Sequence, residues 1–252
     1  MSAPSHALSS SPLASHKYVA FEDLFRGDRE LIRTRQEDYV RLFAHRQDVL
    51  DVGCGRGEFL QALAGRSVRA RGIDLNHEMV EQCRASGLDV TEADALSYLR
   101  GLEDGALGGL IAAQVVEHLE PDYLLAFLDE VFRVLSPGSP IALETINVAS
   151  WSAFFTSYIR DLTHVRPIHP DTLKFVVVAS GFLDAEIQLR APLPEGEKLA
   201  AAPAAARAVD MRVTGDEGRA LVALADTFDR NMERLNAQLY APLDYAVVAW
   251  KR

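Results

Sequence analysis

The chain has 252 residues, of which 48% are hydrophobic and 25% are charged. These values are typical of a globular protein that can bury a full core, and they exclude a disordered, collagen-like or coiled-coil chain. The 36 acidic residues outnumber the 26 basic ones, and because a net charge of −10 repels phosphate backbones we expect no nucleic-acid partner.

The start of the chain and its cysteines bear on the cellular compartment. Residues 1–20 are predicted to be a flexible tail, since they have neither the basic start nor the apolar stretch of a signal peptide. No later apolar run approaches the roughly 20 residues that span a bilayer, so we expect no membrane insertion. Cys54 and Cys83 are too few and too far apart for a disulfide framework or a zinc site, which predicts a reducing, cytoplasmic location.

Short apolar runs alternate with helical stretches along most of the chain. Arg29–Phe43 comes first and predicts an amphipathic helix that lies on a larger body. The expected strands are Val49–Val52, Ala70–Asp74, Val90–Glu92, Leu110–Gln114, Ile141–Thr145, Ala185–Leu189 and Tyr245–Trp250. The expected helices between them are Glu58–Leu63, His77–Ser86, Leu96–Leu102, Tyr123–Leu135 and one that Pro170 opens and Gly181 ends. This rhythm predicts βαβ units and a parallel sheet with helices on both faces.

The alternation stops before the last strand. Pro192–Val213 contains three prolines and an alanine-rich stretch, which predicts a linker or insertion. Glu217–Leu239 has apolar residues at steps of three and four, which predicts one long helix. Its apolar face fits ordinary packing, a lid over the site or a homodimer contact. We therefore expect a single domain over residues 21–252, divided into a core (48–190), a linker with a helical lid (191–240) and the last strand (241–252).

Three glycines at alternate positions follow the first strand and precede a helix: Gly53, Gly55 and Gly57. Glycine at these places lets the polar end of a ligand approach the main chain. A dinucleotide fingerprint would need a further glycine where Glu58 or Leu60 stands, so the spacing disfavours a pyrophosphate. Asp51, at the strand end, would repel a phosphate and attract an ammonium group. The run therefore favours a nucleoside that carries an amino acid.

Further polar residues follow the next strands. Asp74 ends the second strand, 17 positions after Gly57, near the distance at which such folds hold ribose hydroxyls with an acid. Asp94 follows the third strand, and Glu117 with His118 follows the fourth. Because open α/β sheets bind ligands at the carboxyl ends of their strands, we expect these groups at one edge.

Together these residues make the chain resemble a class I S-adenosylmethionine-dependent methyltransferase from about Asp48 to Leu189. The resemblance rests on the glycine run, Asp74, Asp94 and the segment Gln114–Leu119. It implies S-adenosyl-L-methionine as cofactor and a Rossmann-like, doubly wound, mostly parallel seven-stranded sheet with an antiparallel last strand, an N-terminal helix and a helical insertion. In such enzymes the glycines border the methionine, Asp74 holds both ribose hydroxyls, Met79 packs on the adenine and Asp94 binds its amino group. The implied cofactor-binding residues are Arg35, Gln36, Asp51, Gly53, Gly55, Gly57, Asp74, Leu75, Met79, Asp94, Ala95 and Gln114.

A narrower resemblance connects three segments with methyltransferases of bacterial glycan pathways, including those that cap O-antigen chains. The segments are Arg35-Gln36, Glu144–Asn147 and Thr163–Pro167. The resemblance implies that the first segment lies over the cofactor and that the other two border the acceptor. The chain departs from the family at Val148 and Leu162, where prolines are usual. The implied function is O-methylation of a sugar or oligosaccharide in polysaccharide biosynthesis, with acceptor contacts from Glu117, Asn147, Arg166 and His169.

Methyl transfer to an alcohol requires a base for the hydroxyl proton or a metal that acidifies the hydroxyl. Our hypothesis is that His164 or His118 is the general base and that Asp161 or Glu144 orients it. An alternative is an Mg²⁺ site formed by Glu144, Asp161 and His164. Two other functions stay open, a methyltransferase of a lipid, quinone or other small metabolite and a non-catalytic binding module, which the intact acidic residues disfavour.

Overall fold

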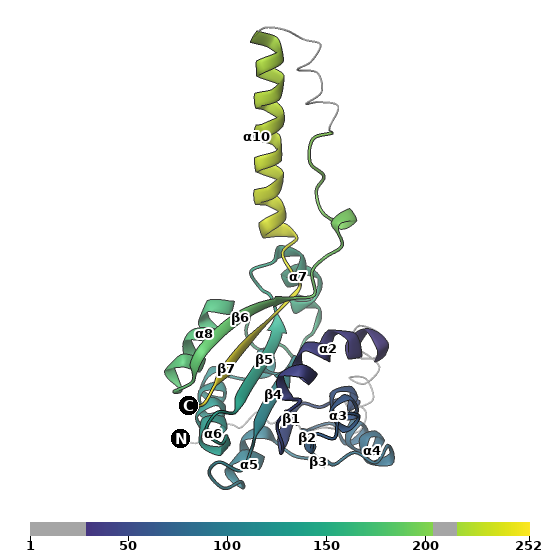
Figure 1. Ribbon diagram of the computed structural model, residues 1–252, viewed down its shortest axis with the longest axis vertical. Coiled ribbons are helices and arrows are strands. Elements are labelled where there is room, and N and C mark those ends of the chain that lie inside the picture. Colours follow the sequence, from purple (N-terminus) through teal and green to yellow (C-terminus); the bar gives the residue numbers. More distant parts are fainter. Residues whose placement is uncertain (1–28, 204–215) are drawn as a thin grey trace.

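The computed structural model describes residues 29–203 and 216–252, so the predicted tail at residues 1–20 lies outside the described residues. At its centre is a seven-stranded sheet in the order β3-β2-β1-β4-β5-β7-β6. The strands are β1 Val49–Val52, β2 Ala70–Asp74, β3 Val90–Glu92, β4 Gly109–Ala113, β5 Pro140–Ile146, β6 Leu183–Arg190 and β7 Asp244–Trp250. Only β7 runs against its neighbours in this sheet, pairing antiparallel with both β5 and β6 (Figure 1). The predicted mostly parallel sheet with an antiparallel last strand is confirmed.

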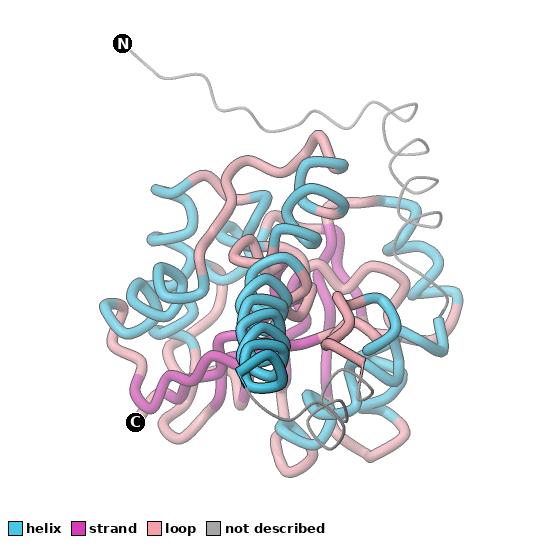
Figure 2. The backbone as a smooth tube through the Cα atoms, turned by 90° about the horizontal axis from the view of Figure 1, so that it is seen from above, coloured by secondary structure: helices cyan, strands magenta, loops and turns pink. Residues whose placement is uncertain are grey.

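Helices lie on both sides of the strands (Figure 2). They are α2 Arg29–Phe43, α3 Glu58–Ala64, α4 His77–Ala85, α5 Ala95–Arg100, α6 Pro121–Val134, α7 Trp151–Thr156, α8 Pro170–Ala179 and α10 Asp216–Leu239, with 3-10 turns at Val116–His118, Tyr158–Arg160 and Glu195–Glu197. Each of these α-helices except α7 begins within two residues of a predicted start. The helix α7 is six residues long, which is too short for a helical period to stand out.

The strand side chains alternate between two apolar cores. Leu50 and Leu110 face the core that contains α5, α6 and α8, whereas Val49 and Ile111 face the core shared with α2 and α3. Phe43 of α2 is fully buried in this second core, and burying a side chain of that size stabilises the fold by roughly 1.5–3 kcal/mol. The amphipathic helix therefore covers a face of the sheet beside the strands that carry the polar residues.

The helix α10 projects from the body (Figure 1). The side chain of Asn236 forms two hydrogen bonds of 2.8 Å with the main chain of Leu199, so the chain at Leu199 lies against this helix. Of the predicted linker, residues 192–203 contain a 3-10 turn and no α-helix or strand, and residues 204–213 lie outside the described residues. Among the described residues, no helix is long and apolar enough to cross a membrane. The domain division and the lid or homodimer role of α10 stay predictions.

Candidate functional site

The first strand ends in a turn whose glycines all have left-handed backbone angles. The φ values of Gly53, Gly55 and Gly57 are 69°, 52° and 76°. A Cβ at Gly53 would lie 2.5 Å from Cγ2 of Val115, and one at Gly57 would lie 2.5 Å from Cδ1 of Leu88. Both the angle and the space therefore require glycine. The turn lies at the carboxyl edge of the sheet, and within it Gly53 and Arg56 are partly exposed.

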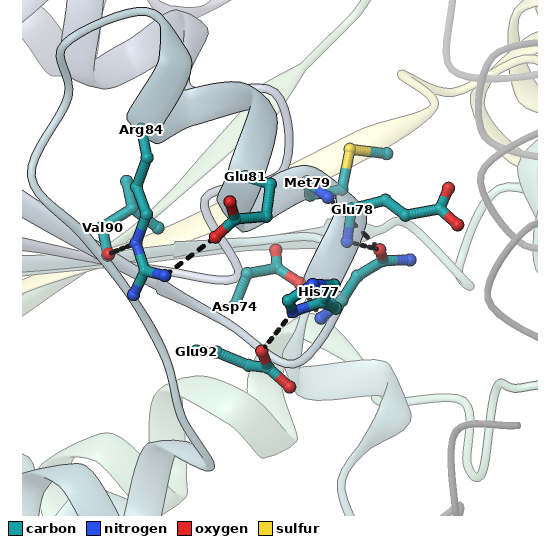
Figure 3. A network of polar contacts seen from close by, with 9 residues as sticks. Asp74, His77, Glu78, Met79, Glu81, Arg84, Val90 and Glu92 are labelled. Carbon is teal, nitrogen blue, oxygen red and sulfur yellow. Dashed lines mark hydrogen bonds and ion pairs between the residues drawn. The ribbon is translucent and has the colours of Figure 1, made fainter. Parts of the chain in front are cut away.

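Asp74 lies beside this turn at the end of β2 (Figure 3). Its Oδ2 accepts a hydrogen bond of 2.9 Å from the Gly55 amide, and its Oδ1 accepts one of 2.8 Å from the Asn76 amide. The Asn76 side chain in turn caps α4 by accepting from the amides of Glu78 and Met79. These bonds orient the Asp74 carboxylate, and because a carboxylate oxygen has two lone pairs, each can accept a second bond from a ribose hydroxyl.

Met79 and Asp94, which were predicted to contact the adenine, and the predicted cofactor residue Leu75 differ in accessibility. Leu75 is 66% exposed and offers apolar surface that a bound ring would cover, whereas Met79 is 2% exposed. Asp94 caps α5 by accepting from the Ser97 amide at 2.9 Å, and it accepts from the Tyr123 hydroxyl at 2.6 Å. Burial opposes ionisation of Asp94, but the hydrogen bonds from Tyr123 and Ser97 outweigh it and hold the pKa below its usual value. Two more predicted cofactor residues lie in β1 and at the start of α5: Asp51 and Ala95.

Glu144 belongs to a polar group between α2 and the sheet. The Tyr39 hydroxyl donates to Glu144, and the Arg190 guanidinium lies 4.5 Å over the Tyr39 ring with its Nε 3.8 Å from the Glu144 carboxylate. Burial raises the pKa of Glu144. These contacts connect α2, β5 and β6. The structure therefore gives Glu144 partners other than the histidines that sequence analysis paired with it.

The remaining predicted cofactor residues lie near Asp244 or on α2. Gln114 has a φ of 58°, which turns the chain sharply after β4, and its Nε2 donates to Oδ1 of Asp244 at 3.3 Å. Burial, together with the neighbouring Glu144, raises the pKa of Asp244 to about 7 against the opposing effects of Arg35 and the Gln114 hydrogen bond. Oε1 of Gln36 is buried and meets no hydrogen-bond partner among the described residues.

Two histidines and a glutamate from separate segments meet beyond the end of β4. Glu117 and His118 lie in the 3-10 turn that follows β4, and the amide of Val165 donates to the Glu117 carbonyl at 2.9 Å. This contact holds the loop that carries His164 against the turn, and the two imidazole centroids are 4.7 Å apart. One carboxylate oxygen and one nitrogen from each ring lie within 4.8 Å of one another. We call Glu117, His118 and His164 the Glu–His cluster.

Hydrogen bonds determine the tautomer of both histidines. The Thr163 hydroxyl donates to Oδ1 of Asp161 at 2.6 Å, so its oxygen accepts from Nδ1 of His118 at 3.0 Å. Nδ1 of His164 donates to the Tyr158 carbonyl at 2.6 Å. Each ring therefore carries its proton on Nδ1 and has its lone pair on Nε2. Asp161 acts on His118 through Thr163, and its Oδ2 is 4.0 Å from Nε2 of His164.

Burial favours the neutral forms of Glu117 and His118. Burial lowers the pKa of His118, and the nearby His164 lowers it further. Burial raises the pKa of Glu117 to about 8. The Glu117 side chain is 1% exposed, and neither carboxylate oxygen has a hydrogen-bond partner within the described part of the chain. The cluster thus presents two basic nitrogens beside an unsatisfied carboxyl group.

The other residues predicted to bind the acceptor lie in different surroundings. Asn147 is 2% exposed, and its amide donates to the Pro242 carbonyl at 2.9 Å and accepts from the Ala149 amide at 3.2 Å. The Nδ2 end of this side chain therefore connects the end of β5 to the start of β7, whereas the Oδ1 end stabilises the local turn after β5. Arg166 is exposed, and His169 caps α8.

Sequence analysis gave no role to Tyr158 or to the Thr163 hydroxyl. The Tyr158 ring stacks on His164 with centroids 4.7 Å apart and planes at 21°. Its segment is a three-residue 3-10 turn, which carries no periodic signal that could have revealed it. Thr163 lies within the predicted acceptor segment, but its bond to His118 depends on a contact across 45 residues.

Comparison with known proteins agrees with this geometry. A family described as a methyltransferase domain matches residues 49–138. A solved S-adenosylmethionine-dependent methyltransferase from Archaeoglobus fulgidus is 35% identical, with a TM-score of 0.82 over 93% of this chain and 99% of that chain. The chain belongs to the S-adenosylmethionine-dependent methyltransferases.

Curated relatives of this methyltransferase include two bacterial proteins. A probable S-adenosylmethionine-dependent methyltransferase of Mycolicibacterium smegmatis is 28% identical over 153 residues, 59% of this chain and 58% of the relative. A ubiquinone biosynthesis O-methyltransferase of Psychrobacter arcticus is 33% identical over 156 residues, 55% of this chain and 60% of the relative. The chain therefore spans about three fifths of the length of these two relatives. A Haemonchus contortus phosphoethanolamine N-methyltransferase in complex with S-adenosyl-L-methionine shares the fold, at 16% identity and a TM-score of 0.53 over 81% of this chain and 48% of that chain.

Proposed function

We propose that this methyltransferase transfers the methyl group of S-adenosyl-L-methionine to a hydroxyl oxygen of a small molecule with an apolar body, such as a quinol or a lipid. The observation that carries the proposal is the Glu–His cluster. Its two imidazoles hold their protons on Nδ1 and present Nε2 lone pairs at the edge of the sheet that carries the glycine turn. A neutral histidine is suited to accept a hydroxyl proton near neutral pH.

The residues at the ends of β1 and β2 fit the cofactor. The left-handed backbone angles at Gly53, Gly55 and Gly57 favour residues without a side chain, which suits a ligand that approaches the main chain closely. The buried carboxylate of Asp51 would attract the methionine ammonium, Asp74 would accept from the ribose hydroxyls, and Leu75 would lie under the adenine. When bound, the cofactor supplies an activated methyl group.

The proposed reaction is an in-line displacement. The acceptor oxygen attacks the methyl carbon from the side opposite sulfur, so a C–O bond forms while the C–S bond breaks. The bonding pair stays on sulfur, which becomes the neutral thioether of S-adenosylhomocysteine. The hydroxyl proton passes to Nε2 of His118 or His164. The protein contributes by holding the oxygen about 3 Å from the carbon and by excluding water.

The surface beside the cluster favours an apolar acceptor. A series of ring contacts joins Trp151, Phe155, Phe154, Tyr158, His164 and His118, with successive centroids 4.7–6.1 Å apart. Trp151 and Phe155 are more than half exposed, and so is Leu162 in the loop before His164. An apolar or aromatic molecule would bury this surface on binding. The similarity to ubiquinone biosynthesis O-methyltransferases supports the same class of acceptor.

The sequence also led to the predictions of a sugar acceptor and of an Mg²⁺ site. The exposed Arg166 and His169 would suit the hydroxyls of a sugar, which stays a prediction. For the metal, Glu144 is bonded to Tyr39 and neighbours Arg190, so it belongs to a different polar group from Asp161 and His164, the other two members of the predicted set.

An acceptor screen tests the proposal. The protein is incubated with methyl-labelled S-adenosyl-L-methionine and with quinols of increasing chain length, fatty acyl alcohols, monosaccharides and oligosaccharides. We expect label in the quinol or lipid products and none in the sugars. His118→Ala should lower turnover by roughly 10²- to 10⁴-fold while cofactor affinity stays the same, and His45→Ala, an exposed histidine after α2, should change neither. Transfer to sugars alone, or equal turnover of His118→Ala and the native protein, would refute the proposal.

A further inference from the structure

We propose that the Glu–His cluster binds one divalent transition-metal ion, of which Zn²⁺ is the representative. Glu117 would provide a carboxylate oxygen, and His118 and His164 would each provide Nε2. Two histidines and one carboxylate are a ligand set that such ions occupy with positions left open for water or substrate.

The first observation is the convergence of the three ligand atoms. One carboxylate oxygen and one nitrogen of each ring lie within 4.8 Å of one another, although Glu117 and His118 come from the turn after β4 and His164 comes from a loop 46 positions later. A metal with bonds of about 2.1 Å needs its ligand atoms about 3–4 Å apart. Small side-chain rotations would bring the set to that spacing. The bond from Val165 to the Glu117 carbonyl keeps the two segments together.

The second observation is the state of Glu117. Its side chain is 1% exposed, and both carboxylate oxygens are without a hydrogen-bond partner among the described residues. A buried carboxyl group in that condition costs folding free energy, because its interaction with water is lost and the nearby Thr145 side chain replaces only part of it. A cation beside Glu117 would satisfy it. The proximity of both imidazole rings shows that the carboxylate is directed at the same point as their nitrogens.

The third observation is the set of residues behind the two imidazoles. A histidine that binds a metal usually donates its other ring nitrogen to a carbonyl or carboxylate, which fixes the tautomer and the ring plane. His164 does this directly with the Tyr158 carbonyl, and His118 does it through the Thr163 hydroxyl to Asp161. Thr163 is thus a positioning residue. Two different segments provide the same arrangement for the two proposed ligands.

The chemistry of the ligand set selects the class of ion. Two imidazole nitrogens and one oxygen suit Zn²⁺ and its neighbours in the first transition row, whereas Mg²⁺ prefers oxygen ligands throughout. The role of the ion rests on the proposed function. With both Nε2 lone pairs on the ion, neither histidine would accept the proton; the ion would take over that role by binding the acceptor hydroxyl and lowering its pKa, and the proton would leave to water. Ion binding itself requires no acceptor and can be measured alone.

Metal titration of the purified full chain tests the inference. The protein is treated with a chelator, dialysed and titrated calorimetrically with ZnCl₂, and in parallel with CoCl₂ while the visible absorption is recorded. We expect one ion per chain and Co²⁺ absorption bands of a site with nitrogen ligands. His164→Ala and the isosteric Glu117→Gln should weaken binding by roughly 100-fold or more. His45→Ala, the exposed control, should bind as tightly as the native protein.

The positioning residue provides a second measurement. Thr163→Val removes the hydroxyl that accepts from His118 and should weaken binding by about 10- to 100-fold, whereas Thr163→Ser should restore it. Far-UV circular dichroism shows whether each variant is folded. If an alanine variant does not fold, the conservative variants Glu117→Gln and Thr163→Ser still test the inference.

Two results would overturn the metal site. They are the absence of saturable binding and binding that Glu117→Gln and His164→Ala leave unchanged. S-adenosylmethionine affinity and methyl transfer are measured on the same samples. Full transfer without metal binding overturns the inference alone, whereas metal binding with no transfer to any hydroxyl overturns the proposed function alone.

Discussion

Replacing Asp74 by alanine is the most direct test of the cofactor site. Its carboxylate accepts from the amides of Gly55 and Asn76 and would accept from two ribose hydroxyls when the cofactor binds. Hydrogen bonds to a charged acceptor contribute about 1.5–3 kcal/mol each, so two lost ribose bonds amount to about 3–6 kcal/mol. Because 1.4 kcal/mol corresponds to a factor of ten, we expect the affinity for S-adenosyl-L-methionine to fall by roughly 100-fold or more.

The assay is isothermal titration calorimetry of Asp74→Ala and the native protein with S-adenosyl-L-methionine. The matched control is Glu92→Ala, which removes a carboxylate from the adjacent strand β3, where it contacts His77 at 2.7 Å (Figure 3). Glu92→Ala should bind as the native protein does. Urea unfolding monitors the loss of the two amide bonds, which should lower the free energy of unfolding by about 2 kcal/mol. Equal binding heats for Asp74→Ala and the native protein, or no heat from either, would refute the reasoning.

Three further predictions concern the turn, a titrating carboxyl group and a buried amide. Gly53→Ala should lower cofactor affinity, because its Cβ would lie 2.5 Å from Val115. Gly138→Ala is the control for backbone strain of about 1–2 kcal/mol, since Gly138 has a similar positive φ but open space around it. Equal cofactor affinities of the two variants would contradict the prediction. Asp244 has a pKa raised to about 7, so the folded state binds more protons than the unfolded state from about pH 4 to 7 and loses stability as pH rises through that window. Each kcal/mol corresponds to about 2–4 °C in Tm for a chain of this size, so Asp244→Asn should raise the Tm by several degrees at pH 8 and change it little at about pH 4, and an equal gain at both pH values would exclude this cause. Asn147→Ala should lower the free energy of unfolding, measured in urea, by about 1–3 kcal/mol, because the side-chain amide joins the end of β5 to the start of β7. The KM for the acceptor should stay the same. A raised KM would instead support a place for Asn147 in the acceptor site.

The cofactor half of the site could be predicted because its signal is local. The strand that ends at Val52, the glycines after it and Asp74 after the next strand lie in one βαβ unit, and adjacent parallel strands bring their carboxyl ends together. Periodicity also identified the helices α2 and α10, which carry apolar residues at helical spacing over 15 and 24 residues.

The details of the adenine side depended on packing. Met79 and Leu75 are both apolar and lie four positions apart, but α4 turns Met79 into the core and leaves Leu75 at the surface. The sequence alone gives no means to distinguish them, because accessibility follows from how α4 packs on the sheet.

The proposed acceptor side of the site, the Glu–His cluster, depended on the tertiary structure. Glu117 and Glu144 both follow or end strands, and from the sequence either could have joined the histidines. The left-handed turn at Gln114 and the pairing of Val165 with Glu117 place that carboxylate beside His118 and His164, while α2 and β6 provide Tyr39 and Arg190 as partners of Glu144. Local sequence patterns determine where strands and helices form. Contacts between residues tens of positions apart depend on the complete fold, and such contacts bring the Glu–His cluster together.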